Sequence, residues 1–180
     1  MSRVARGAAA VRFRVARFEF PYMAARRTGG RRGAPDRPPV LRQTWLDAIA
    51  AIRALGGGAD APLVNGGNSL GGRIASMVAD ESGVAGLVCL GYPFHPPGRP
   101  EKLRTEHLEN LRTRALFVQG TRDPFGTEEE VAGYKLSPRI VFHWLPDGDH
   151  SWKPRASSGR TEAQNLEDGI AAVGDFLKAS

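Results

Sequence analysis

Three residues that together could carry out nucleophilic catalysis follow one another along this sequence. Ser69 lies in the stretch GGNSLGGR, Asp123 in QGTRDPFG and His150 in PDGDHSW. A serine hydroxyl is a weak nucleophile, which becomes reactive when a histidine takes its proton and an acid orients the histidine ring. The order serine, acid, histidine is one that such enzymes use. The first hypothesis is therefore acyl transfer by an activated serine.

The serine lies in a glycine-rich motif, Gly67-Asn68-Ser69-Leu70-Gly71, which matches G-x-S-x-G. It follows a predicted strand, residues 61–64, and precedes a predicted helix, residues 69–80. Small neighbours let the serine adopt a strained backbone, and the helix dipole favours negative charge that develops beside it. The N–H of Leu70 could then donate to an oxyanion. Alternatively, Ser69 simply caps the helix that begins there.

Asp123 and His150 each follow a predicted strand, residues 115–118 and 139–145 respectively. The carboxyl ends of parallel strands meet at one edge of a sheet, where ligands bind. We therefore expect both side chains to lie near Ser69.

Other acids are also candidates for orienting the histidine. Asp147 and Asp149 compete with Asp123, but both are so close in sequence to His150 that they are poorly placed to orient its ring. The alternative for Asp123 is a turn residue before a proline.

The remaining histidines are His95, His107 and His143. His107 lies in a polar predicted helix and His143 in the middle of a strand, so we predict structural roles for both. His95 is the rival base, because its loop also leaves the carboxyl end of a strand. We assign it to the wall of the pocket.

Strand and helix patterns alternate along the chain, which predicts an α/β fold with a mostly parallel sheet flanked by helices. We expect one domain, residues 1–180, with an exposed Arg/Gly/Pro-rich loop at 28–39. The predicted strands are 13–20, 61–64, 84–90, 115–118 and 139–145; the predicted helices are 40–55, 69–80, 101–111, 128–134 and 161–177; a further loop spans 91–98.

The composition is that of an ordinary globular domain, with 41% hydrophobic and 24% charged residues. The single cysteine, Cys89, lies in an apolar run and is predicted to be buried, which fits a reducing, cytoplasmic setting. No apolar run reaches the length of a membrane span. The net charge of +6 comes largely from arginines near the amino terminus. They lack the interleaved aromatics and zinc-finger spacing of nucleic-acid binders, so we expect a solvated surface.

Several stretches together resemble the α/β-hydrolase superfamily: FEFPYMAARR, GGNSLGGRIAS, GLVCLGYPFHPPGRPEKLRTEHL, VQGTRDPFG and DGDHSWKPR. They are most similar to a bacterial group of predicted hydrolases akin to dienelactone-hydrolase-like and testis-expressed hydrolase-like proteins. The similarity runs from Phe13 to the end of the chain. It implies Ser69 as nucleophile, Asp123 as acid and His150 as base, with GYPFHPPG lining the substrate cleft.

The sequence departs from this family at its amino-terminal end. Family members carry earlier strands and a glycine-rich loop, often His-Gly-x-Gly, that supplies a second oxyanion N–H; nothing before Phe13 matches it. Residues 4–11 resemble the helix after that loop, and 13–20 resemble the fourth strand. The first strands, and the third, which normally lies between the fourth and fifth, would then be absent. Either the chain begins late or it closes its sheet differently. Losing one oxyanion donor costs about 100- to 1,000-fold in rate, so we expect weak activity.

The leading hypothesis is a serine hydrolase that cleaves an ester, thioester or related acyl bond of a small molecule, without a metal or cofactor. We expect the cleft to be partly aromatic, lined by Tyr22, Tyr92, Phe94 and His95. The alternative is a non-catalytic or weakly active interaction module whose basic surface binds an acidic partner. The sequence does not predict the oligomeric state.

Overall fold

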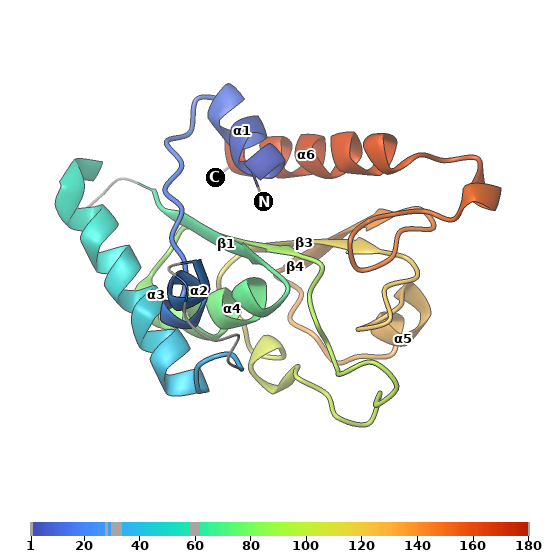
Figure 1. The fold of residues 1–180 in the computed structure, drawn as a ribbon, viewed down its shortest axis with the longest axis horizontal. Helices are drawn as coiled ribbons and strands as arrows, with labels where there is room; N and C mark the ends of the chain where they lie inside the picture. Colours follow the sequence, from blue (N-terminus) through green and yellow to red (C-terminus); the bar gives the residue numbers. More distant parts are fainter. Residues whose placement is uncertain (1, 28, 30–33, 58–61, 180) are drawn as a thin grey trace.

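The computed structural model contains one four-stranded parallel sheet, with its strands in the order β1-β2-β3-β4 (Figure 1). It describes residues 2–27, 29, 34–57 and 62–179. The strands are β1 (Val64–Asn68), β2 (Gly86–Leu90), β3 (Ala115–Gly120) and β4 (Ile140–Leu145). The predicted α/β class with a parallel sheet is confirmed.

Helices cover both faces of the sheet. In Figure 1, α1 and α6 lie over one face, and α3 and α4 over the other. The α-helices are α1 (Ser2–Ala10), α2 (Pro21–Arg27), α3 (Pro38–Ile52), α4 (Leu70–Ser82), α5 (Glu128–Ala132) and α6 (Glu162–Lys178). A π-helical turn follows α3 at Arg53–Gly57, and 3-10 turns lie at Glu106–Leu108 and Ala156–Ser158. None of the helices in the described ranges is long and apolar enough to cross a membrane.

The two middle strands supply side chains to two separate cores. Cys89 and Phe117 point into the core beneath α3 and α4, whereas Val88, Leu90 and Val118 point into the core beneath α1 and α6. Strands buried on both faces are typical of parallel sheets. Because both faces are buried, successive residues of these strands are apolar, which gives continuous apolar runs in the sequence. Burying a side chain such as Phe117 contributes roughly 1.5–3 kcal/mol to folding.

Local signals fix the ends of several helices. Thr127 and Thr161 each form a capping box with the residue three positions on, which satisfies the first N–H groups of α5 and α6. Pro38 occupies the first turn of α3, where its missing N–H costs nothing. Gly83 ends α4 in the left-handed conformation, at φ 58°.

The predicted strand at 13–20 is wrong, since this segment has no regular secondary structure. It crosses from the layer of α1 to that of α3 (Figure 1). In the described part of the chain β1 pairs only with β2, so this segment forms no ladder with it. Phe20 is nevertheless buried, where it packs on Trp45.

The predicted helix at 101–111 is also wrong, because only the turn at Glu106–Leu108 is helical. Tertiary hydrogen bonds compete with helix formation here. The N–H of Arg104 donates to the carbonyl of Phe94, and its own carbonyl accepts from the Tyr92 hydroxyl. The segment is therefore hydrogen-bonded to the loop after β2 instead of forming a helix.

Boundaries shift elsewhere. The predicted strand at 61–64 is found as Val64–Asn68, so the first glycines of the motif belong to the strand itself; Ala61 lies outside the described residues. Of the predicted loop at 28–39, residues 28 and 30–33 lie outside the described residues, 34–37 are irregular, and α3 begins at Pro38.

Candidate active site

Ser69 occupies the sharp turn between β1 and α4. Its backbone has φ 50° and ψ −118°, a conformation that costs a residue with a side chain about 1–3 kcal/mol. Two hydrogen bonds hold the turn: the Ser69 N–H donates to the carbonyl of Leu90 at 2.9 Å, and its carbonyl accepts from the N–H of Arg73 at 3.0 Å. Ser69 is partly exposed at this turn, which lies at the carboxyl end of β1.

Two glycines let the strand and helix approach closely at this turn. A Cβ on Gly67 would lie 2.4 Å from the backbone of Gly71, and a Cβ on Gly72 would lie 2.7 Å from the carbonyl of Gly67. Gly71, the last glycine of G-x-S-x-G, is different, since its nearest neighbour would be the Trp45 ring at 3.9 Å. The close approach therefore depends on Gly67 and Gly72.

The structure brings Ser69, His150 and Asp123 together in one hydrogen-bonded chain. The Nε2 atom of His150 lies 2.9 Å from the Ser69 Oγ, and its Nδ1 lies 2.8 Å from the Asp123 Oδ2. Asp123 is completely buried, whereas the His150 side chain is 23% exposed. The carboxylate can only accept, so the neutral ring carries its proton on Nδ1 and presents Nε2 to the serine as an acceptor.

Asp123 is held by two further donors. The side-chain amide of Gln119 donates to the Oδ2 at 2.9 Å, and the N–H of Phe125 donates to the Oδ1 at 2.9 Å. Gln119 is in turn fixed by both backbone groups of Tyr92. Sequence reasoning missed Gln119, although an amide near the end of a buried apolar strand was an available signal, because such a group needs partners.

The imidazole ring of His150 is packed from two sides. The ring of Phe125 lies over it, with centroids 4.2 Å apart. On another side lies Gly91, at φ 60°, where a Cβ would come within 3.4 Å of the ring. These contacts restrict the ring to the orientation that joins Ser69 to Asp123.

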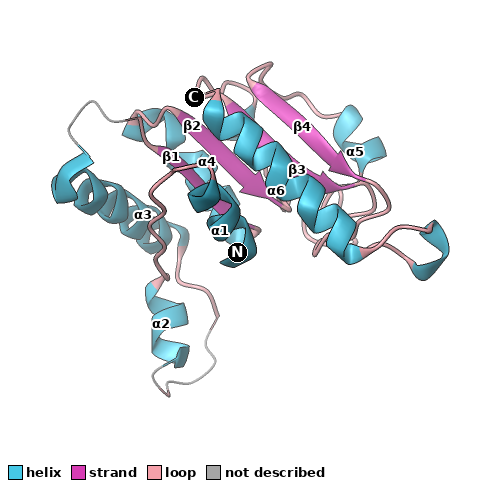
Figure 2. Ribbon diagram, turned by 90° about the horizontal axis from the view of Figure 1, so that it is seen from above, coloured by secondary structure: helices cyan, strands magenta, loops and turns pink. Residues whose placement is uncertain are grey.

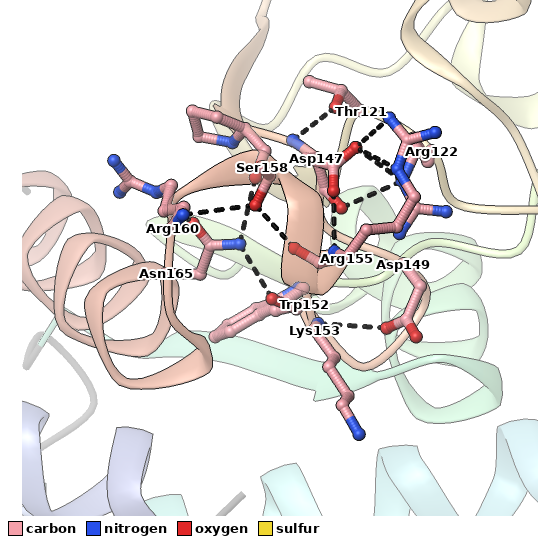
Figure 3. A network of polar contacts seen from close by, with 11 residues as sticks. Thr121, Arg122, Asp147, Asp149, Trp152, Lys153, Arg155, Ser158, Arg160 and Asn165 are labelled. Carbon is pink, nitrogen blue, oxygen red and sulfur yellow. Dashed lines mark hydrogen bonds and ion pairs between the residues drawn. The ribbon is translucent and has the colours of Figure 1, made fainter.

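The loops that carry Asp123 and His150 are tied together (Figure 3). The N–H of Asp147 donates to the Thr121 hydroxyl, and the side chain and backbone N–H of Arg122 bind the carbonyls of Asp147 and Gly148. The Asp147 carboxylate also pairs with Arg155, and this hydrogen bond is the main cause that lowers the pKa of Asp147 to about 2. Asp147 is therefore ionised and occupied in holding the loop.

Neither of the competing acids reaches the histidine ring through its hydrogen bonds. Asp147 binds the arginines, and Asp149 accepts from the N–H groups of Ser151 and Lys153 within its own loop. The carboxylate that accepts the hydrogen bond from the His150 Nδ1–H is that of Asp123.

Asn165 of α6 holds both ends of the histidine loop, residues 146–152, by hydrogen bonds (Figure 3). Its side chain is fully buried, and its amide donates to the carbonyls of Pro146, at 3.2 Å, and Trp152, at 2.8 Å. Arg160 donates to the amide oxygen of the same side chain. Asn165 was not identified from sequence, because it reads there as one more polar residue in an amphipathic helix.

The aromatic residues expected to line the cleft lie mostly in the core. Tyr92 and Phe94 are both completely buried and pack on Phe117. Burial raises the pKa of the Tyr92 phenol strongly. Tyr22 lies on α2, which projects from the rest of the chain in Figure 2, and its ring stacks on Phe20.

His95 points toward Glu130. Its Nδ1 lies 2.9 Å from the carbonyl of Pro96, and its Nε2 lies 3.5 Å from the Glu130 carboxylate. The side chain is almost completely buried. Its backbone N–H bonds to the carbonyl of Phe125, so His95 supports the residue that packs on His150.

The other two histidines lie in structural surroundings, as their sequence context indicates. His107 contacts the buried Ser76 hydroxyl through its Nε2, at 2.8 Å, and burial, with the nearby charge of Arg73, lowers its pKa to about 4. His143 lies within β4, where burial also lowers its pKa. Cys89 is buried, and that burial raises the pKa of its thiol.

A strand–serine–helix turn with the acid and the histidine after later strands is the arrangement of one known family. A family model described as an alpha/beta hydrolase domain matches residues 1–178. The chain belongs to the alpha/beta hydrolase family. The narrower bacterial group named from sequence stays a prediction.

Solved structures of alpha/beta hydrolases share this fold. A protein of unknown function from Agrobacterium tumefaciens, assigned to the family, matches with a TM-score of 0.71 and 18% identity over 98% of this chain and 74% of that one. The esterase domain of a Rhodothermus marinus protein matches at 0.58 and 20%, over 99% and 76%. A serine hydrolase homologue from Coxiella burnetii matches at 0.61 and 17%, over 83% of this chain; the match spans only 64% of that protein. At these identities the likeness shows the fold alone.

In the ranges that the structure describes, no three histidine, cysteine, aspartate or glutamate side chains gather as a metal site would require.

Proposed function

We propose that the protein is a serine hydrolase that cleaves an ester, thioester or related acyl bond. The observation that carries this proposal is the hydrogen-bonded chain from the Ser69 Oγ through His150 to the buried Asp123. A serine at positive φ between a strand and a helix supports it, because that geometry exposes the hydroxyl beside the positive end of the helix dipole.

In the first half of the reaction, the Ser69 Oγ attacks the substrate carbonyl carbon while the Nε2 of His150 takes its proton. The carbonyl π electrons move onto oxygen, and the N–H of Leu70 is positioned to stabilise that charge. Leu70 is the first residue of α4, so its N–H has no acceptor within the helix. The Asp123 carboxylate stabilises the imidazolium through the Nδ1–H.

The tetrahedral intermediate then collapses, and the bond to the leaving group breaks. His150 donates its proton to the departing alcohol or thiol, leaving the acyl group on Ser69. Water attacks this acyl-enzyme with His150 again as base, which releases the acid and restores the serine.

A fluorophosphonate probe tests the nucleophile directly, because it phosphonylates only an activated serine. We expect the wild type to be labelled and Ser69→Ala to be unlabelled. Ser76→Ala is the matched control, since it removes a second serine that lies beside a histidine; we expect it to keep the label. An unlabelled wild type with native circular dichroism would contradict the proposal.

Substrate class can be measured with nitrophenyl esters and thioesters of increasing acyl length. Hydrolysis that is lost in Ser69→Ala would support acyl-bond cleavage and give the preferred chain length. Because Tyr92 and Phe94 are buried, the acyl preference depends on residues other than those two rings.

A further inference from the structure

The side chain of Gln119 is an amide buried beside the proposed catalytic acid. It lies near the end of β3, on the same face of the sheet as Phe117, and it is completely buried. A buried amide is costly unless its donors and its acceptor are bonded, so this glutamine requires partners for both ends of the amide. Those partners determine how it acts on Asp123.

Four polar groups fix the direction of the amide. Its Oε1 accepts from the N–H of Tyr92 at 2.7 Å. Its Nε2 lies 2.9 Å from the Asp123 Oδ2, 3.1 Å from the carbonyl of Tyr92 and 3.3 Å from the carbonyl of Gly126. The reversed amide would point an oxygen at three acceptors and an N–H at a donor, so these contacts exclude it. The amide therefore presents an N–H to the carboxylate.

Two donors share one oxygen of Asp123. The Oδ2 accepts from Gln119 and, at 2.8 Å, from the Nδ1–H of His150. The Oδ1 accepts from the N–H of Phe125. A hydrogen bond to a carboxylate stabilises its negative charge and so weakens its attraction for a second donor. Gln119 therefore reduces the strength with which Asp123 holds a protonated His150 ring.

Among the described residues, the acid and the ring form an ion pair only with each other. The charged side chains of the adjoining loops are bound elsewhere. Arg122 pairs with Asp147, and Asp149 accepts from N–H groups of its own loop. The ring is packed against Phe125 and Gly91, which do not titrate. An uncharged donor is therefore what adjusts the attraction between the acid and the ring.

A general base has to take up a proton and release it again within one reaction. In the proposed mechanism, His150 accepts the proton of Ser69 and then donates it to the leaving group. A carboxylate that held the charged ring too strongly would favour uptake at the expense of release, and it would keep the ring charged to higher pH. The donor at the Oδ2 thus matters for both steps.

Gln119 also has a structural connection. Through Tyr92 it joins the loop after β3 to the loop after β2, which places Gly91 against the His150 ring. Loss of the amide would loosen this joint whatever happens to the charge on Asp123. A test must therefore separate a change in proton binding from a change in packing.

We propose that Gln119 is a positioning residue of the site: by sharing the Asp123 Oδ2 with His150, it limits how strongly the acid holds the protonated ring. This role rests on the proposed function, in which His150 is the base. It goes further, because it assigns the balance between proton uptake and release to a neutral side chain that acts through Asp123.

The titration of the His150 ring, followed by NMR of its carbon-bound protons in the full chain, tests this role without requiring activity. Gln119→Met removes the donor and keeps a side chain of similar length. We expect the midpoint of the titration to rise by about 0.5–1 pH unit, because the carboxylate then holds the ring cation more strongly. Asn165→Leu is the matched control, since it removes another buried amide, one that holds the histidine loop through backbone carbonyls. Its midpoint should stay within about 0.2 unit of the wild type.

Kinetics provide a second readout on the same variant. Gln119→Met should lower kcat for a nitrophenyl ester by about 10- to 100-fold and leave KM within about threefold, because the acid and the ring do not bind the ground-state substrate. The acid limb of its pH–rate profile should move to higher pH by the same amount as the ring titration.

A midpoint that is unchanged or lower in Gln119→Met overturns the proposal. An equal rise in Asn165→Leu also overturns it, since the shift would then follow from loosened loops. If Gln119→Met does not fold, the wild type decides: the side-chain amide protons of Gln119 should shift with the same midpoint as the ring, and amide protons that do not respond overturn the proposal. A wild type that a fluorophosphonate does not label would contradict the serine hydrolase, whereas the NMR titrations would still decide the role of Gln119.

Discussion

In the described residues two serine–histidine pairs have nearly the same distance between hydroxyl and ring, and only one of them has the surroundings of a catalytic pair. Ser69 and His150 are 2.9 Å apart, and Ser76 and His107 are 2.8 Å apart. Both serines belong to the same region of chain, the first at the start of α4 and the second within it. Distance alone therefore does not distinguish them.

The direction of the hydrogen bond differs between the two pairs. The Ser76 hydroxyl donates its only proton to the carbonyl of Arg73, so the Nε2 of His107 has to act as the donor to Ser76. At Ser69 the ring is set the other way, because Asp123 takes the Nδ1–H and leaves the Nε2 of His150 as an acceptor. A base that accepts the serine proton is thus available at one site and not at the other.

The two pairs also differ in how exposed the serine is and in whether a carboxylate binds the histidine. Ser76 is buried in a regular helix, whereas Ser69, in its strained turn, is a partly exposed residue. In the described residues no carboxylate pairs with His107, whose pKa of about 4 keeps it neutral. A reactive pair in this fold needs an acid behind the ring, a free hydroxyl proton and an open approach.

We expect the largest difference between the two pairs in the loss of activity that follows when the histidine of each pair is replaced. His150→Gln should lower kcat/KM by about 10⁴-fold or more, since the base is lost. His107→Gln should change it less than about threefold. Ester hydrolysis and the rate of fluorophosphonate labelling measure both. Equal losses in the two variants would contradict the assignment of the catalytic pair.

Asp123→Asn would make the Ser69–His150 pair more like the Ser76–His107 pair by removing its acid. We expect kcat/KM to fall about 10³- to 10⁴-fold, because the amide can donate to Nδ1 and thereby favour the wrong tautomer. Asp149→Asn is the control, with an expected change under about threefold, since the Asp149 carboxylate accepts from the backbone N–H groups of Ser151 and Lys153 in its own loop. The measurement is esterase activity on folded variants, and a small effect of Asp123→Asn would exclude it as the orienting acid.

Ser69 lies in a tight turn, whereas Ser76 lies within a helix. Replacing the glycines of that turn tests how much each one contributes to the stability of the protein. Gly67→Ala should lower the free energy of unfolding by about 3 kcal/mol, because its Cβ would lie 2.4 Å from backbone. Gly71→Ala should leave stability unchanged or raise it by about 0.5–1 kcal/mol, since alanine favours the helix and has room. Urea unfolding measures both. Equal losses of unfolding free energy in the two variants would contradict the view that the close backbone contact at Gly67 makes that glycine necessary.

The smallest expected effect is the contribution of His107, in the Ser76–His107 pair, to the pH dependence of stability. The pKa of His107 is lowered to about 4 in the folded chain, whereas an unfolded histidine titrates near 6.5. Protons therefore bind the unfolded state first, so this contribution to stability is complete above about pH 6.5 and is lost as pH falls toward 4.

Between pH 7.5 and pH 5.0 the wild type should lose about 1–2 kcal/mol more unfolding free energy than His107→Gln, allowing for partial solvent screening. Urea titrations at the two pH values give the difference. His143→Gln is the control and should retain the pH dependence due to His107. An identical pH response of wild type and His107→Gln would contradict the buried, neutral imidazole.

The sheet and the candidate site were largely predictable, because their signals are local. Phe117 and Phe142 belong to the apolar runs of β3 and β4, and Asp123 and His150 follow the ends of those two runs. The hydrogen bonds themselves depend on parallel strands bringing their carboxyl ends together, which is a general rule of the fold.

The failures share a physical cause, since each depended on a partner distant in sequence. Residues 13–20 alternate like a strand, but a strand forms only by pairing with another, and in the described chain this segment pairs with none. The segment at 101–111 forms its hydrogen bonds with Tyr92 and Phe94. Gln119 and Asn165 are polar residues whose partners only the folded chain brings near.

The anchoring of the histidine loop by Asn165 has a consequence for biosynthesis. Ser69 and His150 are 81 residues apart, and the loop that presents the base is held from α6, the final helix of the described chain. A nascent chain would complete the serine turn early in translation, yet it would have no anchored base until α6 leaves the ribosome. The serine would thus lack its anchored base until α6 has docked, and its reactivity would report that α6 is in place.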